Sequence, residues 1–339
     1  MRRQAHLIKE SFNKFQLELH GKIVLTEAAT GNFVCTAILA AMAGAKVYAI
    51  AKNSRYGSAS QAHDAVISIA KELGIENQIT IIYSLDEIDL GKIDVVTNTG
   101  FVRPIDKLMI EKLNPNCVIP LMYEPWEFRP SDIDLEYAVR KGIKVYGTNE
   151  SDYRLQTMNY IGLTVLYFLL KEKRSPFNSR ILLIGCEKFN KAIEGKLKKL
   201  NYSVSSFLTD KYITENIGEY DTIVLAEHTN SKLIIGNSDA SLIRSSSITE
   251  DQLIIHISGN VDFSMLNCKH YPETPASFRY MSYTTDFIDP LAVSNLHAAG
   301  LKVGEGMLKA NQDGLKGLYF KSFMEIKYPA LAFVNEKYW

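Results

Sequence analysis

The sequence predicts an α/β protein with two domains, each built around a parallel sheet. Short β-rich apolar runs alternate with helical segments along most of the chain, and this alternation is typical of doubly wound parallel sheets. The length of 339 residues is also too great for one ordinary hydrophobic core and suits two. We therefore place one domain at residues 1–152 with 298–339 and the other at residues 153–297.

The first half of the chain is expected to begin with an amphipathic helix. Its apolar residues recur at helical spacing, namely Leu7, Ile8, Phe12, Phe15 and Leu17. β-rich runs then predict strands, and two of the helices between them are expected to end at Gly44 and Gly74. The expected strands lie at residues 22–26, 46–50, 79–82, 94–96, 118–122 and 144–146, and the expected helices at 33–43, 61–73, 106–113 and 132–141.

The second half is expected to begin with a helix at residues 155–171 that is long enough to cross between the domains. Further strands are predicted with helical material between the last two, and a helix from Pro290 toward Ala310 would return the chain to the first domain. The aromatic tail, Gly317–Trp339, is expected to pack there or at a dimer interface. These strands lie at residues 180–184, 203–207, 222–226 and 253–257, with a helix at 190–200.

Bulk properties argue against several kinds of partner. Lys and Arg together number 38, as do Asp and Glu, so no net field attracts nucleic acid or an anionic membrane. The longest apolar stretch, Ile161–Leu170, is too short to span a bilayer, and the amino terminus lacks the apolar run of a signal peptide. The four cysteines are widely spaced, without a CxxC pair. We expect a cytoplasmic protein that binds no metal, nucleic acid or membrane.

The segment from Asp94 to Leu170 carries the most specific pattern in the chain. Three strand-like runs each stop at a polar loop, the last of them in IDLEYAVRKGIKVYGTN, and a long apolar helix follows. This order resembles the substrate-domain half of the D-2-hydroxyacid dehydrogenases, the formate/glycerate dehydrogenase superfamily. The resemblance implies two Rossmann-like domains, one flavodoxin-like and one nucleotide-binding-like, with a cleft between them. It also implies a homodimer formed through the region of the crossing helix, where Tyr160, Tyr167 and Phe168 lie.

The same resemblance implies a catalytic arginine, carboxylate and histidine. His297 in NLHAAG matches the histidine, which exchanges a proton while hydride moves to nicotinamide, and Asp289 in DFIDPL matches the carboxylate that orients it. Ser258 in LIIHISGNVD stands at the arginine position, and a hydroxyl does not replace a bidentate guanidinium. Arg103 lies in a loop that contacts substrate in the family, so it is our candidate for the missing anion contact.

The second domain would hold NAD or NADP after the strand RILLIG. The family fingerprint has several glycines there, so that the backbone approaches the pyrophosphate at a helix N-terminus. Here Gly185 is the one glycine in place, and Phe189 and Asn190 stand in the same region. The acidic residue expected after the next strand arrives late, at Asp210, and we count Ser258 with these cofactor-binding candidates. Retention and loss of the dinucleotide both stay open.

Loops that follow strands of the first domain carry polar, charged and aromatic side chains. The carboxyl ends of parallel strands are the usual ligand region of such a sheet. A helix N-terminus after the first strand suits an anion, and cations after the second suit a phosphate or a carboxylate. The alternative is that these are solvated loops without a ligand. The candidate substrate- or anion-binding residues are Thr30, Gly31, Asn32, Lys52, Ser54, Arg55, Asn98, Tyr123 and Glu124.

These observations predict an enzyme similar to the NAD(P)-dependent 2-hydroxyacid dehydrogenases. Its substrate would be a small anion in the interdomain cleft, either a 2-hydroxy or 2-keto acid or a phosphorylated compound. The altered dinucleotide loop and Ser258 favour an alternative with the same fold. That alternative is a non-redox enzyme, or a protein that binds a nucleotide or another metabolite.

Overall fold

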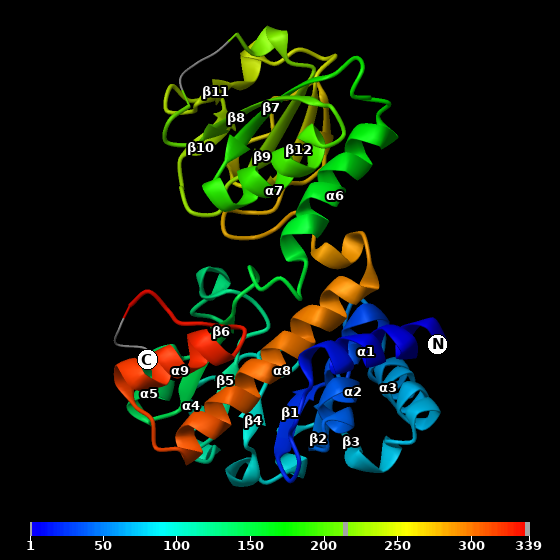
Figure 1. Ribbon diagram of the computed structural model, residues 1–339, viewed down its shortest axis with the longest axis vertical. Helices are drawn as coiled ribbons and strands as arrows, with labels where there is room; N and C mark the ends of the chain where they lie inside the picture. Colours follow the sequence, from blue (N-terminus) through cyan, green and yellow to red (C-terminus); the bar gives the residue numbers. More distant parts are fainter. Residues whose placement is uncertain (1, 213–215, 336–339) are drawn as a thin grey trace. The chain divides into compact units, whose positions relative to one another are not determined.

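The computed structural model describes residues 2–212 and 216–335 (Figure 1). The chain divides into a first unit, Met1–Leu155 with Pro290–Trp339, and a second unit, Gln156–Asp289. Each unit contains a mainly parallel sheet with helices, which confirms the predicted α/β fold class. The chain re-enters the first unit at Pro290, where helix α8 (Pro290–Gln312) begins. The boundary between the units therefore lies eight residues before the predicted boundary at residue 298.

The sheet of the first unit has the strand order β15-β6-β5-β4-β1-β2-β3. Neighbouring strands are parallel except β15, which runs antiparallel to β6. Apart from β15, this is the order of the dinucleotide-binding doubly wound fold, in which the strand order reverses between β1 and β4. The strands are β1 (Ile23–Glu27), β2 (Lys46–Ile50), β3 (Ile79–Ile82), β4 (Val95–Val96), β5 (Val118–Pro120), β6 (Lys144–Thr148) and β15 (Ala330–Leu331).

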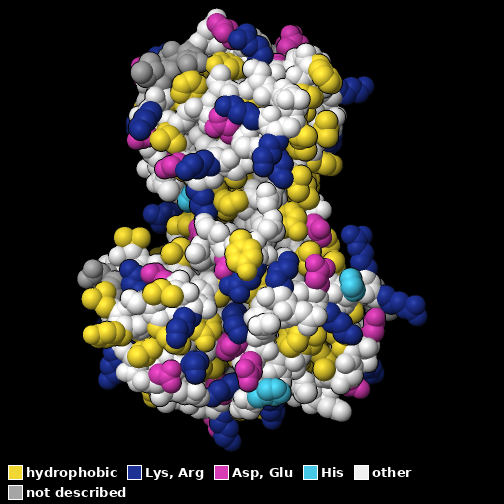
Figure 2. Space-filling view, in the orientation of Figure 1, with side chains coloured by type: hydrophobic (Ala, Val, Ile, Leu, Met, Phe, Trp, Pro, Cys, Tyr) yellow, Lys and Arg dark blue, Asp and Glu magenta, His cyan; other side chains and the backbone are white. Residues whose placement is uncertain are grey.

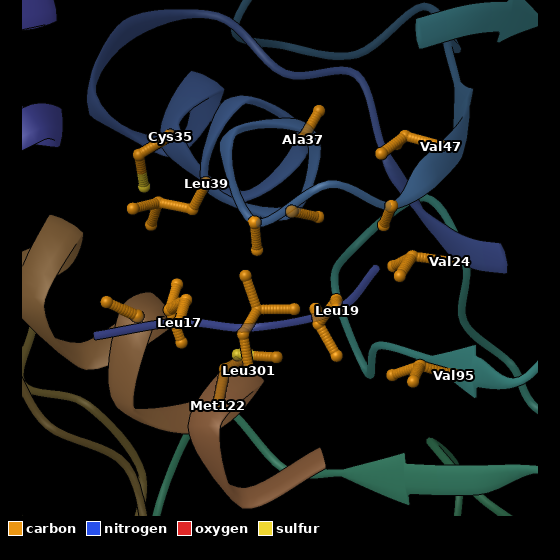
Figure 3. Packing of buried hydrophobic residues seen from close by; sticks show 14 of the residues in the cluster. Leu17, Leu19, Val24, Cys35, Ala37, Leu39, Val47, Val95, Met122 and Leu301 are labelled. Carbon is orange, nitrogen blue, oxygen red and sulfur yellow. The ribbon is translucent and has the colours of Figure 1, made fainter. Parts of the chain in front are cut away.

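Helices cover both faces of this sheet because successive strand residues point to opposite sides. Val24 belongs to the core under α1, α2, α3, α8 and α9, and the next residue, Leu25, belongs to the core under α4 and α5. Figure 3 shows the first of these cores, with Cys35 and Leu39 of α2 and Leu301 of α8. The remaining helices are α1 (Arg2–Phe15), α2 (Cys35–Met42), α3 (Ala59–Leu73), α4 (Lys107–Lys112), α5 (Leu135–Arg140) and α9 (Gly317–Lys327).

The second unit has a parallel sheet in the order β14-β12-β9-β7-β8. This is the flavodoxin-like order, which reverses between β7 and β9. Helices α6 and α7 pack against each other, and α7 also packs on β7 and β8. The elements are α6 (Thr157–Lys171), β7 (Arg180–Gly185), α7 (Glu187–Lys198), β8 (Ser203–Leu208), β9 (Thr222–Ala226), β12 (Leu253–Ser258) and β14 (Lys269–Tyr271).

The prediction of helical material between β9 and β12 was wrong. This segment instead contributes β10 (Leu233–Gly236) and β11 (Ile243–Arg244), which form a small parallel sheet with β13 (Asn260–Val261). The buried residues Ile234, Ile235 and Ile243 are β-branched, and a segment that contains Gly, Asn, Ser and Asp separates the first two from the third. Such short runs between turn residues favour strands over a helix.

The aromatic tail lies on the first unit as far as it is described. Phe320 and Met324 of α9 join the first core, and Trp339 falls outside the described residues. No helix in the described part of the chain is both long and apolar enough for a membrane span. Figure 2 shows Lys and Arg side chains interspersed with Asp and Glu on the visible face, in line with their equal numbers.

Candidate functional site

The carboxyl edge of the first sheet carries polar side chains at its point of reversal. Ligands of open α/β sheets bind in the crevice at such a point. Glu27 is the last residue of β1, and Asn98 lies in the loop after β4. The side chains are buried, with 7% and 2% exposed, respectively. Two buried polar groups therefore lie where the topology predicts a ligand.

Glu27 is held against the loop that follows β4. The backbone N–H of Phe101 donates to Glu27 Oε2 at 3.0 Å. A Cβ on Gly100 would lie 3.1 Å from the same oxygen, so the glycine allows this close approach. Burial raises the pKa of Glu27, and the Phe101 hydrogen bond and the charge of Arg103 only partly oppose that rise. A carboxyl group with a raised pKa is suited to exchanging a proton.

Arg103 links this edge to a second carboxylate. Arg103 Nη1 donates to Asp132 Oδ2 at 2.6 Å, and Arg129 Nη1 lies 3.6 Å from the same oxygen. Burial, together with the charge of Asp132, raises the pKa of Tyr123 to about 12. Arg103 is thus in place to meet an anion, but it already shares Asp132, so a ligand has to compete with that ion pair or extend it.

Asn98 connects the loops after β4 and β5. The Met122 backbone N–H donates to Asn98 Oδ1 at 2.8 Å. No well-formed hydrogen bond reaches Asn98 Nδ2 within the described residues, although the amide lies close enough to Tyr123 to lower the pKa of that phenol. The structure therefore brings Asn98, Tyr123 and Arg103 together at one edge of the sheet, as the sequence predicts.

A pocket of about 540 Å³ adjoins this edge, and we call it the first-unit pocket. Loops after β2, β3 and β4 form its walls together with α4. Its charged side chains carry both signs. The lining residues are Lys52, Leu85, Asp86, Ile88, Asp89, Leu90, Gly91, Val102, Arg103, Pro104, Asp106, Leu108, Met109 and Lys112.

The carboxylates and the lysines of this pocket differ in their partners. Asp106 caps α4 by accepting from the Met109 backbone N–H at 2.9 Å. Asp89 caps a short 3-10 turn in the same way, and its other oxygen lies 3.6 Å from an exposed lysine. Asp86 accepts from the Ser84 hydroxyl at 3.2 Å. Lys52 and Lys112 form no ion pair with any described residue. The structure therefore leaves cationic charge available in the pocket.

The loops after β1 and β2 contact each other outside this pocket. Thr30 Oγ1 donates to the backbone carbonyl of Tyr56 at 3.2 Å. The Arg55 guanidinium stacks on the Tyr56 ring, 4.7 Å from its centroid. Of the residues in these two loops, Lys52 lines the first-unit pocket. Five other candidates from these loops do not line it, namely Thr30, Gly31, Asn32, Ser54 and Arg55.

A group of carboxylates follows β5. Glu124 accepts from Trp126 Nε1 at 2.9 Å and from the Glu150 backbone N–H at 3.0 Å. Burial and the neighbouring charge of Glu124 raise the pKa of Glu127 to about 7, against the opposing effect of Arg129. Glu124 thus holds two loops together. Within the described ranges, no three or more His, Cys, Asp or Glu side chains are grouped to hold a metal ion.

His297 belongs to α8 in the first unit, and its side chain faces the start of α2. Its side chain is 5% exposed. The ring contacts Phe33 edge-on, with centroids 5.7 Å apart, and Nδ1 pairs with Thr36 Oγ1. Asp289 is the last residue of the second unit, immediately before α8. The catalytic pairing of these two residues stays a prediction.

A second pocket, of about 460 Å³, lies at the reversal point of the second sheet, and we call it the second-unit pocket. Burial raises the pKa of Glu227, but hydrogen bonds from Thr209, Thr229 and Asn230 outweigh this and lower it overall. None of the described lining residues is Lys or Arg. They are Gly185, Cys186, Glu187, Leu208, Thr209, Asp210, Glu227, Thr229, Asn230 and Ser231.

Three cofactor-binding candidates are buried outside this pocket. Phe189 packs against His228, with ring centroids 4.5 Å apart. Asn190 Nδ2 donates to the carbonyl of Phe207 at 2.8 Å, and Ser258 is fully buried in β12. Packing inside the unit occupies these side chains, so they are not placed to line a cofactor site in this pocket.

The second-unit pocket does not fit the pyrophosphate of a dinucleotide. Helix α7 begins with Glu187, so a carboxylate stands where the phosphate charge would be received. Glu227 and Asp210 add further negative charge. A Cβ on Gly185 would lie 2.2 Å from the carbonyl oxygen of Ala226, so the glycine serves the close approach of β7 and β9.

Sequence reasoning missed several of these residues. Glu27 had a readable signal, because an acidic residue at the end of the first strand of such a sheet stands at the ligand edge. Asp132 and Lys112 had no such signal, since neither follows a strand directly. Their places beside Arg103 and in the pocket depend on how the loops fold over the sheet.

No family model matches the chain, and no curated protein matches it. The solved A chain of dipicolinate synthase from Bacillus subtilis is 14% identical, with a TM-score of 0.56, and the match covers 87% of this chain and 99% of that chain. The corresponding dipicolinate synthase chain from Bacillus halodurans is 12% identical, with a TM-score of 0.54 and coverage of 83% and 96%.

Solved D-2-hydroxyacid dehydrogenases are also among the matches. One is the NAD-complexed D-isomer specific 2-hydroxyacid dehydrogenase from Lactobacillus delbrueckii ssp. bulgaricus, at 11% identity, with a TM-score of 0.45 and coverage of 88% and 99%. At such identities, likeness concerns the fold and leaves the activity open. The protein shares its α/β fold with the two dipicolinate synthase chains.

Proposed function

We propose that the protein binds a small anionic metabolite, bearing a carboxylate or phosphate group, in the first-unit pocket. The observation that carries this proposal is the difference between the pocket's cations and its carboxylates. Lys52 and Lys112 have no ion-pair partner among the described residues. Of the lining carboxylates, Asp89 and Asp106 cap turns of the backbone, and Asp86 accepts a hydrogen bond from the Ser84 hydroxyl. An entering anion therefore gains charge-assisted hydrogen bonds at little cost in existing contacts.

A non-redox enzyme is the form of this proposal that Glu27 supports. Its buried carboxyl group has a raised pKa and lies near Arg103, which lines the pocket. Glu27 does not line the pocket itself, so Arg103 is the residue that would bring a bound anion near this proton donor or acceptor. Because the second-unit pocket does not fit a pyrophosphate, we propose no hydride step.

Isothermal titration calorimetry at low ionic strength tests the proposal, with pyruvate and inorganic phosphate as separate probes. We expect saturable binding of at least one probe. The Lys52→Ala/Lys112→Ala double variant should bind it about tenfold or more weakly, because each charge-assisted hydrogen bond contributes about 1.5–3 kcal/mol. The control is Lys71→Ala, an exposed lysine of α3 outside the pocket. Equal affinities of the double variant and the unaltered protein would contradict the proposal, as would no binding of either probe.

The second candidate is an NAD(P)-dependent oxidoreductase, which would need the pyrophosphate to bind away from the Glu187 carboxylate. It is favoured by the place of Asp210, which lines the second-unit pocket just after β8, where an acidic residue suits ribose hydroxyls. Titration of NADH and NADPH, followed by nicotinamide fluorescence, separates the candidates. Saturable binding that Asp210→Ala weakens would favour hydride transfer, and no binding of either nucleotide would exclude it.

A further inference from the structure

The second-unit pocket contains a thiol–imidazole pair that the function proposed above does not use. Cys186 Sγ lies 3.0 Å from His228 Nδ1. Cys186 lines the pocket, and each of the two side chains is 8% exposed. They come from the loops after β7 and β9, the two strands between which the strand order of the second sheet reverses. A potential nucleophile and a base therefore meet where the topology predicts a ligand.

Backbone pairing and packing hold this pair together. Gly185 of β7 is the partner of Ala226 of β9, and the Cys186 backbone N–H donates to the Ala226 carbonyl at 3.1 Å. The strands β7 and β9 therefore end side by side, and the loops that carry Cys186 and His228 begin at the same edge of the sheet. The Phe189 ring lies against the imidazole of His228, with centroids 4.5 Å apart. The distance between the thiol and the imidazole is thus set by the sheet register and by an aromatic contact.

The surroundings of Cys186 suit a thiol that loses its proton during a reaction. Burial raises the pKa of Cys186, so the resting group is a thiol. In the tautomer with its proton on Nε2, His228 accepts from this thiol at Nδ1. The backbone N–H groups of Phe189, His228 and Lys188 lower this pKa, whereas the charge of Glu227 raises it further, and the pKa stays raised overall. Cys186 occupies the N-cap position of α7, a 12-residue helix whose N-terminus stabilises negative charge, and its side chain makes no capping hydrogen bond.

None of the other three cysteines, all within the described residues, combines these features. Cys35 and Cys117 are fully buried, and burial raises the pKa of each. Cys268 is buried as well, and it does not line the second-unit pocket. The four cysteines are all unpaired as disulfides. They therefore provide internal references against which the reactivity of Cys186 is measured.

We propose that Cys186 is a nucleophile toward a neutral, hydroxyl-rich aldehyde, with His228 as its base. His228 Nδ1 takes the proton of the thiol, and the sulfur forms a bond to the carbonyl carbon. The π bond of the carbonyl breaks to leave an alkoxide, which takes the proton from His228. The product is a thiohemiacetal, and the step needs no further reactant, oxidant or leaving group.

The pocket lining determines which aldehyde suits the site. Glu187, Asp210 and Glu227 repel an anionic aldehyde, because no Lys or Arg among the described residues lines the pocket. Carboxylates accept hydrogen bonds from hydroxyl groups, and Thr209 and Asn230 extend the polar wall. The second-unit pocket thus favours a neutral ligand, whereas the first-unit pocket is proposed to bind an anion. Each proposal can therefore be contradicted without affecting the other.

Alkylation kinetics at pH 7.0, with peptide mapping by mass spectrometry, test the nucleophile. With iodoacetamide we expect Cys186 to react about tenfold or more faster than the other three cysteines. With iodoacetate, its anionic analogue, the rate at Cys186 should fall much further than that of glutathione. His228→Gln should slow Cys186 about tenfold or more, as loss of a general base does, and the control Cys268→Ser should leave its rate unchanged.

Protection by aldehydes tests the ligand on the unaltered protein, so the proposal stays testable if His228→Gln does not fold. Glyceraldehyde should slow the alkylation of Cys186 in a saturable way, and glyoxylate at the same concentration should not. The proposal is overturned if Cys186 reacts no faster than the other three cysteines. It is likewise overturned if folded His228→Gln leaves the rate unchanged, or if glyceraldehyde gives no protection.

Discussion

Glu27 and Glu227 show how hydrogen bonds decide the charge of a buried carboxyl group. Both lie at the carboxyl edge of a sheet, and both are nearly buried. Burial raises the pKa of Glu27, and the Phe101 N–H and the charge of Arg103 offset only part of this rise. Glu227 accepts from Thr209 at 2.5 Å and from the Thr229 and Asn230 backbone N–H groups, and its pKa is lowered. The first carboxyl suits proton exchange, and the second suits a fixed negative charge.

Glu127 provides a prediction about pH. Burial and the charge of Glu124 raise its pKa from 4.5 to about 7. The folded state therefore binds this proton more tightly than the unfolded chain does. The stability that the protonated group contributes is fully present below about pH 4.5 and is lost as the pH rises through about 7. We expect Glu127→Gln to increase the urea midpoint at pH 8 and to change it little at pH 5.

Urea unfolding at the two pH values checks this, with Glu72→Gln as the control. Glu72 is an exposed residue of α3, so its substitution should leave the difference between the two midpoints unchanged. A Glu127→Gln midpoint that follows that of the unaltered protein at both pH values would show that Glu127 titrates normally.

Helix α8 shows how one element depends on residues without side chains. It crosses the first unit against α1, α2, β5 and β6. A Cβ on Gly300 would lie 2.3 Å from Met122 Sδ, and one on Gly306 would lie 2.6 Å from Cγ of Tyr328. Glycine is unfavourable inside a helix, so its presence at these contacts reflects close packing against neighbouring segments.

Two Gly→Ala variants test this at the scale of the helix. Gly306→Ala should lower the free energy of unfolding by about 1–3 kcal/mol, because overpacking against the Tyr328 ring outweighs the better helix propensity of alanine. Gly195→Ala in α7 is the matched control, since no atom lies within 4 Å of its added Cβ. That variant should be more stable by about 0.5–1 kcal/mol. Equal effects of the two substitutions in urea unfolding would contradict the packing account.

The two units differ in how the chain builds them. The second unit is one continuous segment, Gln156–Asp289, whereas the first needs two separate segments. The ends of the continuous segment meet, because Phe168 of α6 stacks on Phe287 at 5.5 Å. Phe168 is buried, and its ring packs against Tyr271, Tyr283 and Phe287 of the same unit. The homodimer expected through the α6 region stays a prediction.

This organisation predicts that residues 156–289 fold when expressed alone. The segment retains its sheet, α6, α7 and the closing contact of Phe168 with Phe287. We expect a single cooperative urea transition by circular dichroism, as is usual for domains of this size. Residues 1–155 expressed without α8 should not show one, because α8 contributes Leu301 and Val303 to the first core. An unfolded second-unit segment would mean that its sheet depends on the rest of the chain.

The sequence by itself determined the class of fold and most elements. Period and turn chemistry are local, so helices such as α3 and α8 and most strands of both sheets were predictable close to their observed bounds. The short strands β14 and β15 were not predicted. The segment between β9 and β12 was an exception, because short β-branched runs have no clear period. Strand-end loops also indicated correctly where Asn98, Tyr123 and Arg103 would gather, since parallel strands end at one edge.

Only the tertiary structure decided which side chains meet. Arg103 pairs with Asp132 across 29 residues, and Cys186 meets His228 across 42. Such pairs depend on sheet register and loop packing, which no local pattern encodes. Burial is likewise a property of the folded chain, and it distinguishes the raised pKa of Glu27 from the lowered pKa of Glu227. The elements follow from short-range preferences, whereas the chemistry of the sites follows from long-range contacts and the solvent that they exclude.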